Sequence, residues 1–272
     1  MFIMLTKYLC MFFLGLMLLV ISNLQAATIH VPDNYKTIQE AVKNASPRDT
    51  IIVHEGYYTE NIIITKPLTI ESTKGSDASI IHAAVQNEPV LKINNVNEVS
   101  ISGFTVTGSQ SAGIYLYNSH NGQLRGNKVV NNGSGIVLIS SNNNTFVNNT
   151  ANLNEQYGIY LELSNNNILE KNIVNSNKDK GIFLSSSSYN ELINNNVNLN
   201  AWNGITLWSS HNNLLKDNNI LRNRYGIVLS DSNNNILTNN STWSNIYAIL
   251  PIVLIYIGIL LYLVQKHLLR FI

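Results

Sequence analysis

Residues 135–157, GIVLISSNNNTFVNNTANLNEQY, and residues 158–180, GIYLELSNNNILEKNIVNSNKDK, are two copies of one repeat. Six copies in all begin with a Gly-Ile pair, and successive pairs lie 22 or 23 residues apart. The glycines of these pairs are Gly113, Gly135, Gly158, Gly181, Gly204 and Gly226. So regular a period predicts a stack of similar units, each of which buries its apolar side chains against its neighbours.

Each repeat contains three short apolar segments. When the glycine is counted as position zero, position one is always Ile, position three is always Leu, position eleven is Leu or Phe, and a further apolar residue lies near position sixteen. These are alternating patterns of only a few residues, and an Asn interrupts each of them. The repeat therefore predicts three short strands.

Asparagine occupies fixed places between these strands, at positions fourteen and nineteen of every copy and at position nine of five copies. Asn tolerates the left-handed backbone of a sharp bend, and its amide can bond the Asn one repeat above and below. We therefore expect ladders of stacked Asn along the axis, as in cross-β assemblies. The predicted ladder residues are Asn127, Asn149, Asn172, Asn195, Asn218 and Asn240, and Asn132, Asn154, Asn177, Asn200 and Asn223.

Parallel strands that repeat about every 4.8 Å and close into a coil form a parallel β-helix. The prediction is an all-β, right-handed, three-faced parallel β-helix over residues 51–245, regular over 113–245. Leu91 and Ile93 lie 23 residues before Ile114 and Leu116, which extends the coil backward. A leucine-rich repeat is the rival fold, but the chain lacks its L-x-x-L-x-L-x-x-N pattern and its helical half-repeat.

The two ends of the chain are apolar. Only 12% of the 272 residues are charged and 45% are hydrophobic, whereas soluble domains have about a quarter charged residues. Residues 1–27 have the layout of a secretory signal peptide. Residues 246–264 carry no charge and are long enough for a transmembrane helix, and the basic residues that follow predict a cytoplasmic tail over 265–272. The alternative for this segment is a hydrophobic capping strand, but a buried strand is rarely nineteen residues long.

Residues 28–50 are expected to cap the coil. Thr37 and Glu40 have the spacing of a helix capping box, and the apolar residues that follow lie on one face of a short helix. Such a helix would cover strand backbone and apolar interior that an open end exposes.

The cap and the repeats together resemble a known family. Residues 29–72, IHVPDNYKTIQEAVKNASPRDTIIVHEGYYTENIIITKPLTIES, are followed by VSISGFTV at 99–106 and then by the repeated GIxLxxSxxNxLxxN. This text resembles the NosD-like family, also described as the carbohydrate-binding and sugar-hydrolysis β-helix. The resemblance covers residues 28–245 and implies the fold. For activity it implies a choice among polysaccharide enzymes, a maturation factor for a copper enzyme, and surface proteins.

The repeat alignment predicts no catalytic, cofactor or metal residues. A polysaccharide lyase or hydrolase needs two or three carboxylates close together, but no two acidic residues of the regular repeats share a position. Glu155 and Lys178 do share one, which predicts an exposed ion pair. The histidines lack metal-site spacing, and no Met or Cys follows the signal segment. The net charge of +1 gives no case for nucleic-acid binding.

Aromatic side chains are expected to form an outward stripe on the first strand face, where sugar rings can stack. The candidate carbohydrate contacts are Tyr115, Tyr117, Tyr160, Phe183, Trp202, Trp208 and Tyr225. Aromatic residues also favour exposed strand positions in general, and a protein partner would suit the same stripe.

These features predict a membrane-anchored, exported, non-catalytic β-helix that binds carbohydrate or has a structural role at the cell surface. The alternatives are a polysaccharide lyase or hydrolase, and an accessory to a membrane transporter in copper-enzyme maturation. No cap separates Asn245 from the apolar segment, so we expect the bilayer, a partner or self-association to cover that end.

Overall fold

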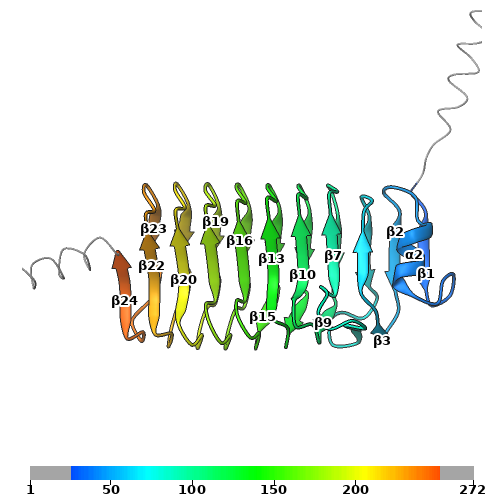
Figure 1. Ribbon diagram of the computed structural model, residues 1–272, viewed down its shortest axis with the longest axis horizontal. Coiled ribbons are helices and arrows are strands. Elements are labelled where there is room, and N and C mark those ends of the chain that lie inside the picture. Colours follow the sequence, from blue (N-terminus) through cyan, green and yellow to red (C-terminus); the bar gives the residue numbers. More distant parts are fainter. Residues whose placement is uncertain (1–25, 252–272) are drawn as a thin grey trace, which may run out of the picture.

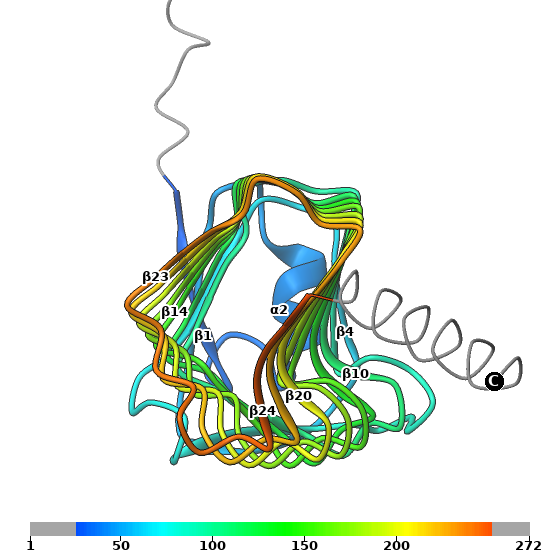
Figure 2. The ribbon, with the colours of Figure 1, turned by 90° about the vertical axis from the view of Figure 1, so that its left-hand side faces the viewer.

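The computed structural model describes residues 26–251, which form a single parallel β-solenoid (Figure 1). Three parallel sheets run along its axis, with ten strands in sheet A, nine in sheet C and five in sheet B. The all-β parallel solenoid that the repeat predicts is confirmed. Figure 2 shows the coil end-on, with the strands of successive turns superposed around the axis.

The strands of each sheet come from successive repeats. Sheet A contains β1 (Thr28–Val31), β2 (Thr50–Val53), β5 (Thr69–Ser72), β8 (Ser100–Ser102), β11 (Gln123–Arg125), β14 (Thr145–Val147), β17 (Ile168–Glu170), β19 (Glu191–Ile193), β21 (Leu214–Lys216) and β23 (Ile236–Thr238). Sheet C contains β4 (Ile62–Ile64), β7 (Leu91–Asn94), β10 (Ala112–Tyr117), β13 (Ser134–Ile139), β16 (Ile159–Glu162), β18 (Ile182–Ser185), β20 (Asn203–Trp208), β22 (Tyr225–Ser230) and β24 (Tyr247–Pro251). Sheet B contains β3 (Gly56–Thr59), β6 (Ser79–His82), β9 (Thr105–Thr107), β12 (Lys128–Val130) and β15 (Thr150–Asn152), and isolated bridges through Ile173, Asn196, Asn219 and Ser241 continue it.

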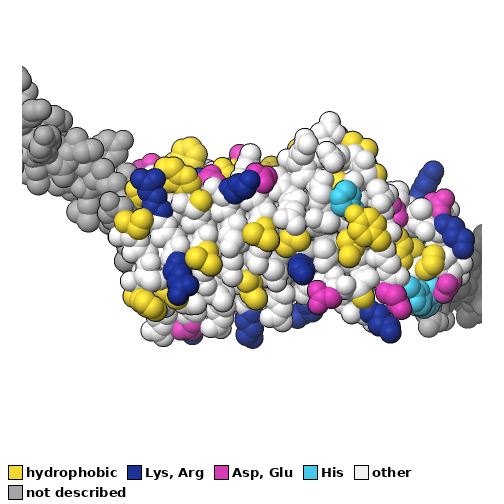
Figure 3. Space-filling model, turned by 90° about the horizontal axis from the view of Figure 1, so that it is seen from below, with side chains coloured by type: hydrophobic (Ala, Val, Ile, Leu, Met, Phe, Trp, Pro, Cys, Tyr) yellow, Lys and Arg dark blue, Asp and Glu magenta, His cyan; other side chains and the backbone are white. Residues whose placement is uncertain are grey.

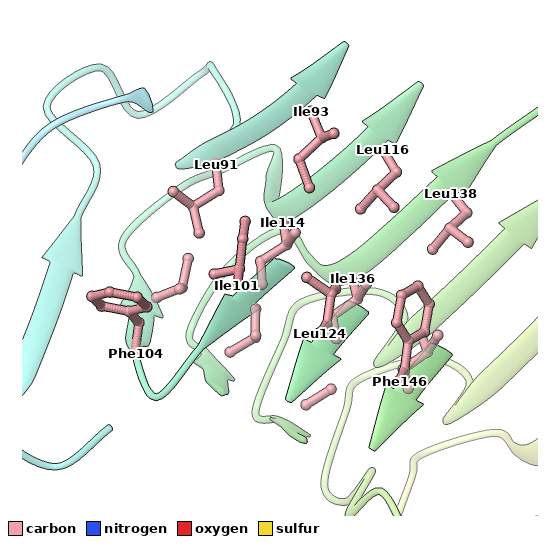
Figure 4. Packing of buried hydrophobic residues seen from close by; sticks show 14 of the residues in the cluster. Leu91, Ile93, Ile101, Phe104, Ile114, Leu116, Leu124, Ile136, Leu138 and Phe146 are labelled. Carbon is pink, nitrogen blue, oxygen red and sulfur yellow. The ribbon is translucent and has the colours of Figure 1, made fainter. Parts of the chain in front are cut away.

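The core is a column of side chains from equivalent positions. Ile114 and Leu116 pair in register with Ile136 and Leu138, and all four are buried (Figure 4). At Gly113, Gly158, Gly181 and Gly204 a glycine is needed because the side of the coil that continues sheet B approaches sheet C closely there. A Cβ on Gly158 would lie 2.2 Å from Val174 Cγ1, so a side chain at this position would force the two sheets apart.

Hydrogen bonds join every predicted ladder Asn to its equivalents. Asn172 shows the pattern: its Nδ2 donates to Asn195 Oδ1 at 3.0 Å and to the Phe146 carbonyl at 2.9 Å. Its Oδ1 accepts from the backbone and side-chain nitrogens of Asn149 at 3.0 and 3.1 Å. Each ladder amide therefore joins neighbouring rungs and also satisfies a buried carbonyl at a bend.

Two further ladders supplement those at positions fourteen and nineteen. Position nine contributes Asn144, Asn167, Asn190, Asn213 and Asn235, linked side chain to side chain. At position six, each serine Oγ from Ser141 onward accepts the backbone N–H of the serine one rung earlier; Ser164 Oγ, for example, accepts from Ser141 at 3.0 Å. Four inner polar ladders therefore line the corners of the coil.

The ladder residues do not themselves adopt the left-handed backbone, which corrects the sequence interpretation. The left-handed residue is the one immediately before each ladder residue, at positions five, eight, thirteen and eighteen. Several are not Asn, among them Leu153 (φ 58°), Lys171 (φ 53°) and Tyr189 (φ 60°). The bend thus needs one left-handed residue of any type, followed by an Asn or Ser whose side chain turns inward.

A short helix, α2 (Ile38–Asn44), lies across the N-terminal end of the coil (Figure 2). The Thr37 side chain accepts from the Glu40 N–H at 3.1 Å, and Ile38, Ala41 and Val42 are buried. A residue outside the capping box completes this N-terminus, because the Glu60 carboxylate accepts the N–H groups of Ile38 and Gln39 at 3.0 and 2.8 Å.

The stack extends beyond the expected boundaries at both ends. β1 pairs with β2 in sheet A, so the coil begins at Thr28 rather than at residue 51. At the other end Tyr247–Pro251 is a strand that pairs with β22, not the first turns of a helix as predicted from residue 246. Ile249 takes the register position of Ile227, because this apolar segment continues the repeat by one strand.

The remaining predictions for the ends fall on residues that the structure does not describe. These are residues 1–25 of the predicted signal peptide, residues 252–264 of the predicted span, and the predicted tail 265–272. Within residues 26–251, no helix has the length and apolar character needed to cross a membrane.

Candidate carbohydrate-binding face

Three aromatic rings meet on the outer face of sheet C. Tyr160 in β16 and Phe183 in β18 are register partners, and their rings stack with centroids 5.1 Å apart and planes at 19°. The Tyr157 ring, from the segment just before β16, lies 5.1 Å from Tyr160 and 5.5 Å from Phe183. We refer to Tyr157, Tyr160 and Phe183 as the aromatic cluster.

Charged groups surround this cluster. Lys180 Nζ lies 5.1 Å from the ring centroids of both Tyr157 and Phe183, and it donates to the Asp179 carboxylate at 3.0 Å. The Tyr160 hydroxyl donates to Glu162 Oε2 at 3.0 Å. Burial, and then the hydrogen bond and charge of Glu162, raise the pKa of Tyr160 to about 12. Tyr160 is therefore a neutral hydroxyl held in one orientation at physiological pH.

Two hollows lie on either side of the aromatic cluster. The first, of about 230 Å³, lies over β10, β13 and β16 and is bounded by Tyr115, Tyr157 and Tyr160, with Gln110, Ser111, Ser134 and Gln156 among its polar lining. The second, of about 420 Å³, lies over β18, β20 and β22 and is lined by Lys180, Phe183, Asn203, Thr206, Trp208, Val228 and Ser230. We refer to the two hollows and the cluster between them as the candidate face.

The structure separates the predicted contact residues into groups. Tyr115 and Tyr160 bound the first hollow, and Trp208, with 52% of its surface exposed, lines the second. Tyr117 is exposed but lies outside both hollows. Phe183 is only 9% exposed, so its prediction as a surface platform needs correction. Tyr157, Tyr160 and Lys180 cover its ring.

Trp202 and Tyr225 belong to a second aromatic group at the edge of the same sheet. The Arg224 guanidinium lies 4.4 Å from the Trp202 ring centroid and 5.6 Å from that of Tyr225. This stacking holds the two predicted residues against a cation. Arg224, Lys180 and Asp179 were absent from the predicted contacts, because the aromatic pattern alone does not show which charges the bends bring alongside it.

Acidic side chains are distributed along the stack. Glu155 and Lys178 form the predicted exposed ion pair, with Lys178 Nζ 2.7 Å from Glu155 Oε2. On the face shown in Figure 3, charged side chains are likewise dispersed along the solenoid. Within residues 26–251, the one group of three or more His, Cys, Asp or Glu side chains with converging ligand atoms is His30, Asp33 and His54.

That group corrects the view that the histidines are isolated. His30 and His54 are 24 residues apart, about one turn of the coil, and the pairing of β1 with β2 places them side by side. The alignment of the regular repeats could not reveal this, because the first turn lies outside the regular register.

Comparison with known proteins identifies the family. The family model described as "Periplasmic copper-binding protein (NosD)" matches residues 42–245 and 200–262. The chain belongs to the NosD family. A cell surface glycoprotein of Methanothermus fervidus is 32% identical over 109 residues, which is 39% of this chain and 18% of that protein. The chain therefore spans less than a fifth of the length of this curated relative.

Solved structures similar to this NosD-family chain show its fold alone. Pectate lyase Pel9A superposes with a TM-score of 0.61 at 13% identity, over 75% of this chain and 67% of that one. The catalytic domain of a GH87 α-1,3-glucanase superposes with a TM-score of 0.57 at 16% identity, over 75% of this chain and 41% of that one. The periplasmic alginate epimerase AlgG superposes with a TM-score of 0.52 at 15% identity, over 78% of this chain and 83% of that one.

The family's description names copper, and the side chains present differ from those that Cu(I) prefers. Cu(I) prefers thiolate and thioether ligands, but all four Met and the single Cys lie within the first 17 residues. The described residues thus do not fit a Cu(I) site. Imidazole and carboxylate, the donors of His30, His54 and Asp33, suit divalent ions instead.

Proposed function

We propose that this NosD-family chain is an exported, non-catalytic solenoid that binds a polysaccharide along the outer face of sheet C. The observation that carries the proposal is the pair of hollows on either side of the aromatic cluster. Ligand sites combine apolar and aromatic surface with a few polar groups that fix orientation. Both hollows have this composition.

The chemistry of the lining suits sugar rings. The C–H face of a pyranose can pack against Tyr115, Tyr160 or Trp208, while its hydroxyls bond amide and hydroxyl groups beside them. In the first hollow those groups are Gln110, Ser111, Ser134 and Gln156, and in the second they are Asn203, Thr206 and Ser230. The face carries one paired cation, Lys180, so the proposal favours a ligand recognised by shape and hydroxyls over one recognised by charge.

The length of the face suits a polymer. From β10 to β22 the strands take five steps of about 4.8 Å, so the two hollows lie along roughly 24 Å of one straight sheet. A polysaccharide could occupy both hollows at once. Two weak contacts with the same glycan then give a much higher overall affinity than either contact alone. The inner ladders hold the face rigid before binding, which limits the entropy lost on association.

Export and membrane anchoring are part of the same proposal. The layout of residues 1–27 supports export, and the family description "periplasmic" and the relative's description "cell surface" agree with it. The apolar segment that continues past Pro251 supports an anchor. The face would then be displayed outside the cytoplasmic membrane.

Binding to immobilised glycans tests this function. The purified full-length chain is applied to a glycan array and to polysaccharide affinity gels, together with Tyr160→Ala and Trp208→Ala. We expect retention on at least one polymer and a loss of about 10-fold or more in affinity for each variant, since removal of an anchoring aromatic costs more than about 1.4 kcal/mol.

The matched control is Trp243→Ala. Trp243 is 78% exposed but lies outside both hollows, so its removal should leave retention unchanged. No retention on any polymer, or equal losses for Trp208→Ala and Trp243→Ala, would contradict the proposal. Release of reducing ends or unsaturated products from a bound polymer would show that the face is catalytic.

A further inference from the structure

Three potential metal ligands converge where the chain enters the solenoid. His30 lies in β1, Asp33 in the turn that follows it, and His54 directly after β2. One ligand atom from each side chain lies within 4.8 Å of the other two. The imidazole rings of the two histidines have centroids 5.7 Å apart. In Figure 3, histidine and acidic side chains adjoin near this end of the molecule.

The backbone on both sides of this group is fixed. The His54 N–H donates to the Val31 carbonyl at 2.9 Å, and the His54 carbonyl accepts from the Tyr58 hydroxyl at 3.0 Å and the Ser79 hydroxyl at 3.2 Å. Across from it, the His30 N–H donates to Asn34 Oδ1 at 2.7 Å, which closes the turn that carries Asp33. The ligand set is therefore held by ordered structure and not by a loose loop.

One of the proposed ligand atoms is a buried nitrogen without a hydrogen-bond partner among the described residues. This atom is His54 Nε2. Asp33 Oδ2 lies 3.6 Å away, too far for a hydrogen bond. Ligands at about 2.0–2.1 Å from a tetrahedral zinc ion are about 3.3–3.4 Å apart, close to this separation.

We propose that His30, Asp33 and His54 bind one divalent transition-metal ion. Two imidazole nitrogens and one carboxylate oxygen are donors that suit Zn²⁺ or Cu²⁺, and water would complete the coordination. The site would have no soft donor for Cu(I). Its place in the fold also gives it a structural consequence, because the ion would join β1, the first strand of sheet A, to the segment after β2.

The surrounding charge favours a cation. Glu55 follows His54 directly in the sequence, and the Asp33 carboxylate lies 3.6 Å from His54 Nε2. A divalent ion would offset this concentration of negative charge.

Metal titration of the full-length chain tests the site. The protein carries no polyhistidine tag and is first stripped with EDTA. We expect one equivalent of Co²⁺ to give the visible absorption of a tetrahedral or five-coordinate site, and Zn²⁺ to displace it and raise the Tm. His54→Gln and Asp33→Asn should each lower Zn²⁺ affinity by at least about 100-fold, since loss of an outer-shell partner already costs 10–100-fold.

Two comparisons make the result decisive. Asp33 has a side chain 66% exposed, so Asp33→Asn should keep the wild-type circular dichroism and Tm in EDTA. His211→Asn is the matched histidine control, because Asn occupies the same repeat position at Asn142, Asn165 and Asn233. His211→Asn should bind Zn²⁺ as wild type does. The proposal is overturned if Zn²⁺, Cu²⁺ and Co²⁺ all fail to bind at one equivalent, or if Asp33→Asn binds Zn²⁺ as tightly as His211→Asn.

Discussion

Single residues carry the cost of the sharp bends. Leu153 is 54% exposed and has φ 58°, a left-handed conformation that costs an L-residue with a Cβ roughly 1–2 kcal/mol. Leu163 and Leu199 are in the same situation at their own bends, with 53% and 52% exposed. The fold tolerates this cost because the ladder residue that follows each bend is buried and fully bonded.

Replacing such a leucine by asparagine should stabilise the protein. For Leu153→Asn we expect the free energy of unfolding to rise by about 0.5–1 kcal/mol, because Asn adopts the left-handed region at lower cost and little buried surface is lost. Thermal and urea denaturation measure it. Leu153→Ala is the control, since Ala keeps the backbone cost. Equal stability of the two variants would show that the bend is not strained.

Tyr160 should make stability depend on pH in the alkaline range. Its pKa is raised from 10.0 to about 12 in the folded protein, by burial and then by Glu162. Between these values the unfolded chain releases the phenolic proton while the folded protein keeps it, so rising pH favours unfolding. We expect the free energy of unfolding to fall from pH 10 to 12, and to fall less in Tyr160→Phe. Parallel curves for the two proteins would mean that Tyr160 titrates normally.

At the scale of elements, α2 depends on residues brought from the next turn of the coil. Glu60 accepts two N–H groups at its start, and Lys66 Nζ donates to the Lys43 and Ala45 carbonyls at its end, at 2.8 and 2.7 Å. A helix of seven residues is too short to be stable alone in water. The start of this helix was predictable from Thr37 and Glu40. Its contacts with Glu60 and Lys66 were not, because these residues lie 21–24 positions away in the sequence.

Loss of the Glu60 carboxylate should loosen this cap. We expect Glu60→Gln to lower the free energy of unfolding by about 1–3 kcal/mol, since two charge-assisted hydrogen bonds to the helix N-terminus are disrupted. Glu40→Gln removes the same charge from the first turn, where the Glu40 side chain is exposed, and should cost much less. Equal losses in the free energy of unfolding for the two variants would show that Glu60 acts through its charge alone and not through its two hydrogen bonds.

The whole molecule is a stack in which each rung satisfies the next. Asn172 lies inside a ladder and makes bonds in both directions, whereas Asn240 is the last of that ladder and is only partly buried. An interior amide that is removed leaves several buried groups without partners, each at a cost of about 1–3 kcal/mol. The cost of losing a ladder Asn should therefore depend on its place in the stack.

We expect Asn172→Ala to lower the free energy of unfolding by at least about 3 kcal/mol, and Asn240→Ala by less than half as much. Chemical denaturation of both variants, compared with Asn233→Ala at an exposed position without left-handed backbone, measures the difference. Similar losses at positions 172 and 240 would contradict a ladder whose bonds are shared between rungs.

The sequence predicted this architecture because the repeat period admits few alternatives. Identical spacing of Ile114, Leu116 and their equivalents determined the register of sheet C, and the Asn positions marked the corners. It failed where a contact does not follow from the residue positions that recur in every repeat. Tyr157 lies before the strand and covers Phe183, and β1 brings His30 to His54 through a register that the regular repeats do not contain.

Binding of oligosaccharides of increasing length tests the central claim most directly. A fragment of the polymer retained by the full-length chain is titrated against wild type and Trp208→Ala, and the Kd is measured at each length. If one glycan spans both hollows, affinity should rise with length until the chain covers about 24 Å and then level off, and Trp208→Ala should remove that rise. An affinity that is independent of length, or a rise that persists in Trp208→Ala, would contradict a binding face along sheet C.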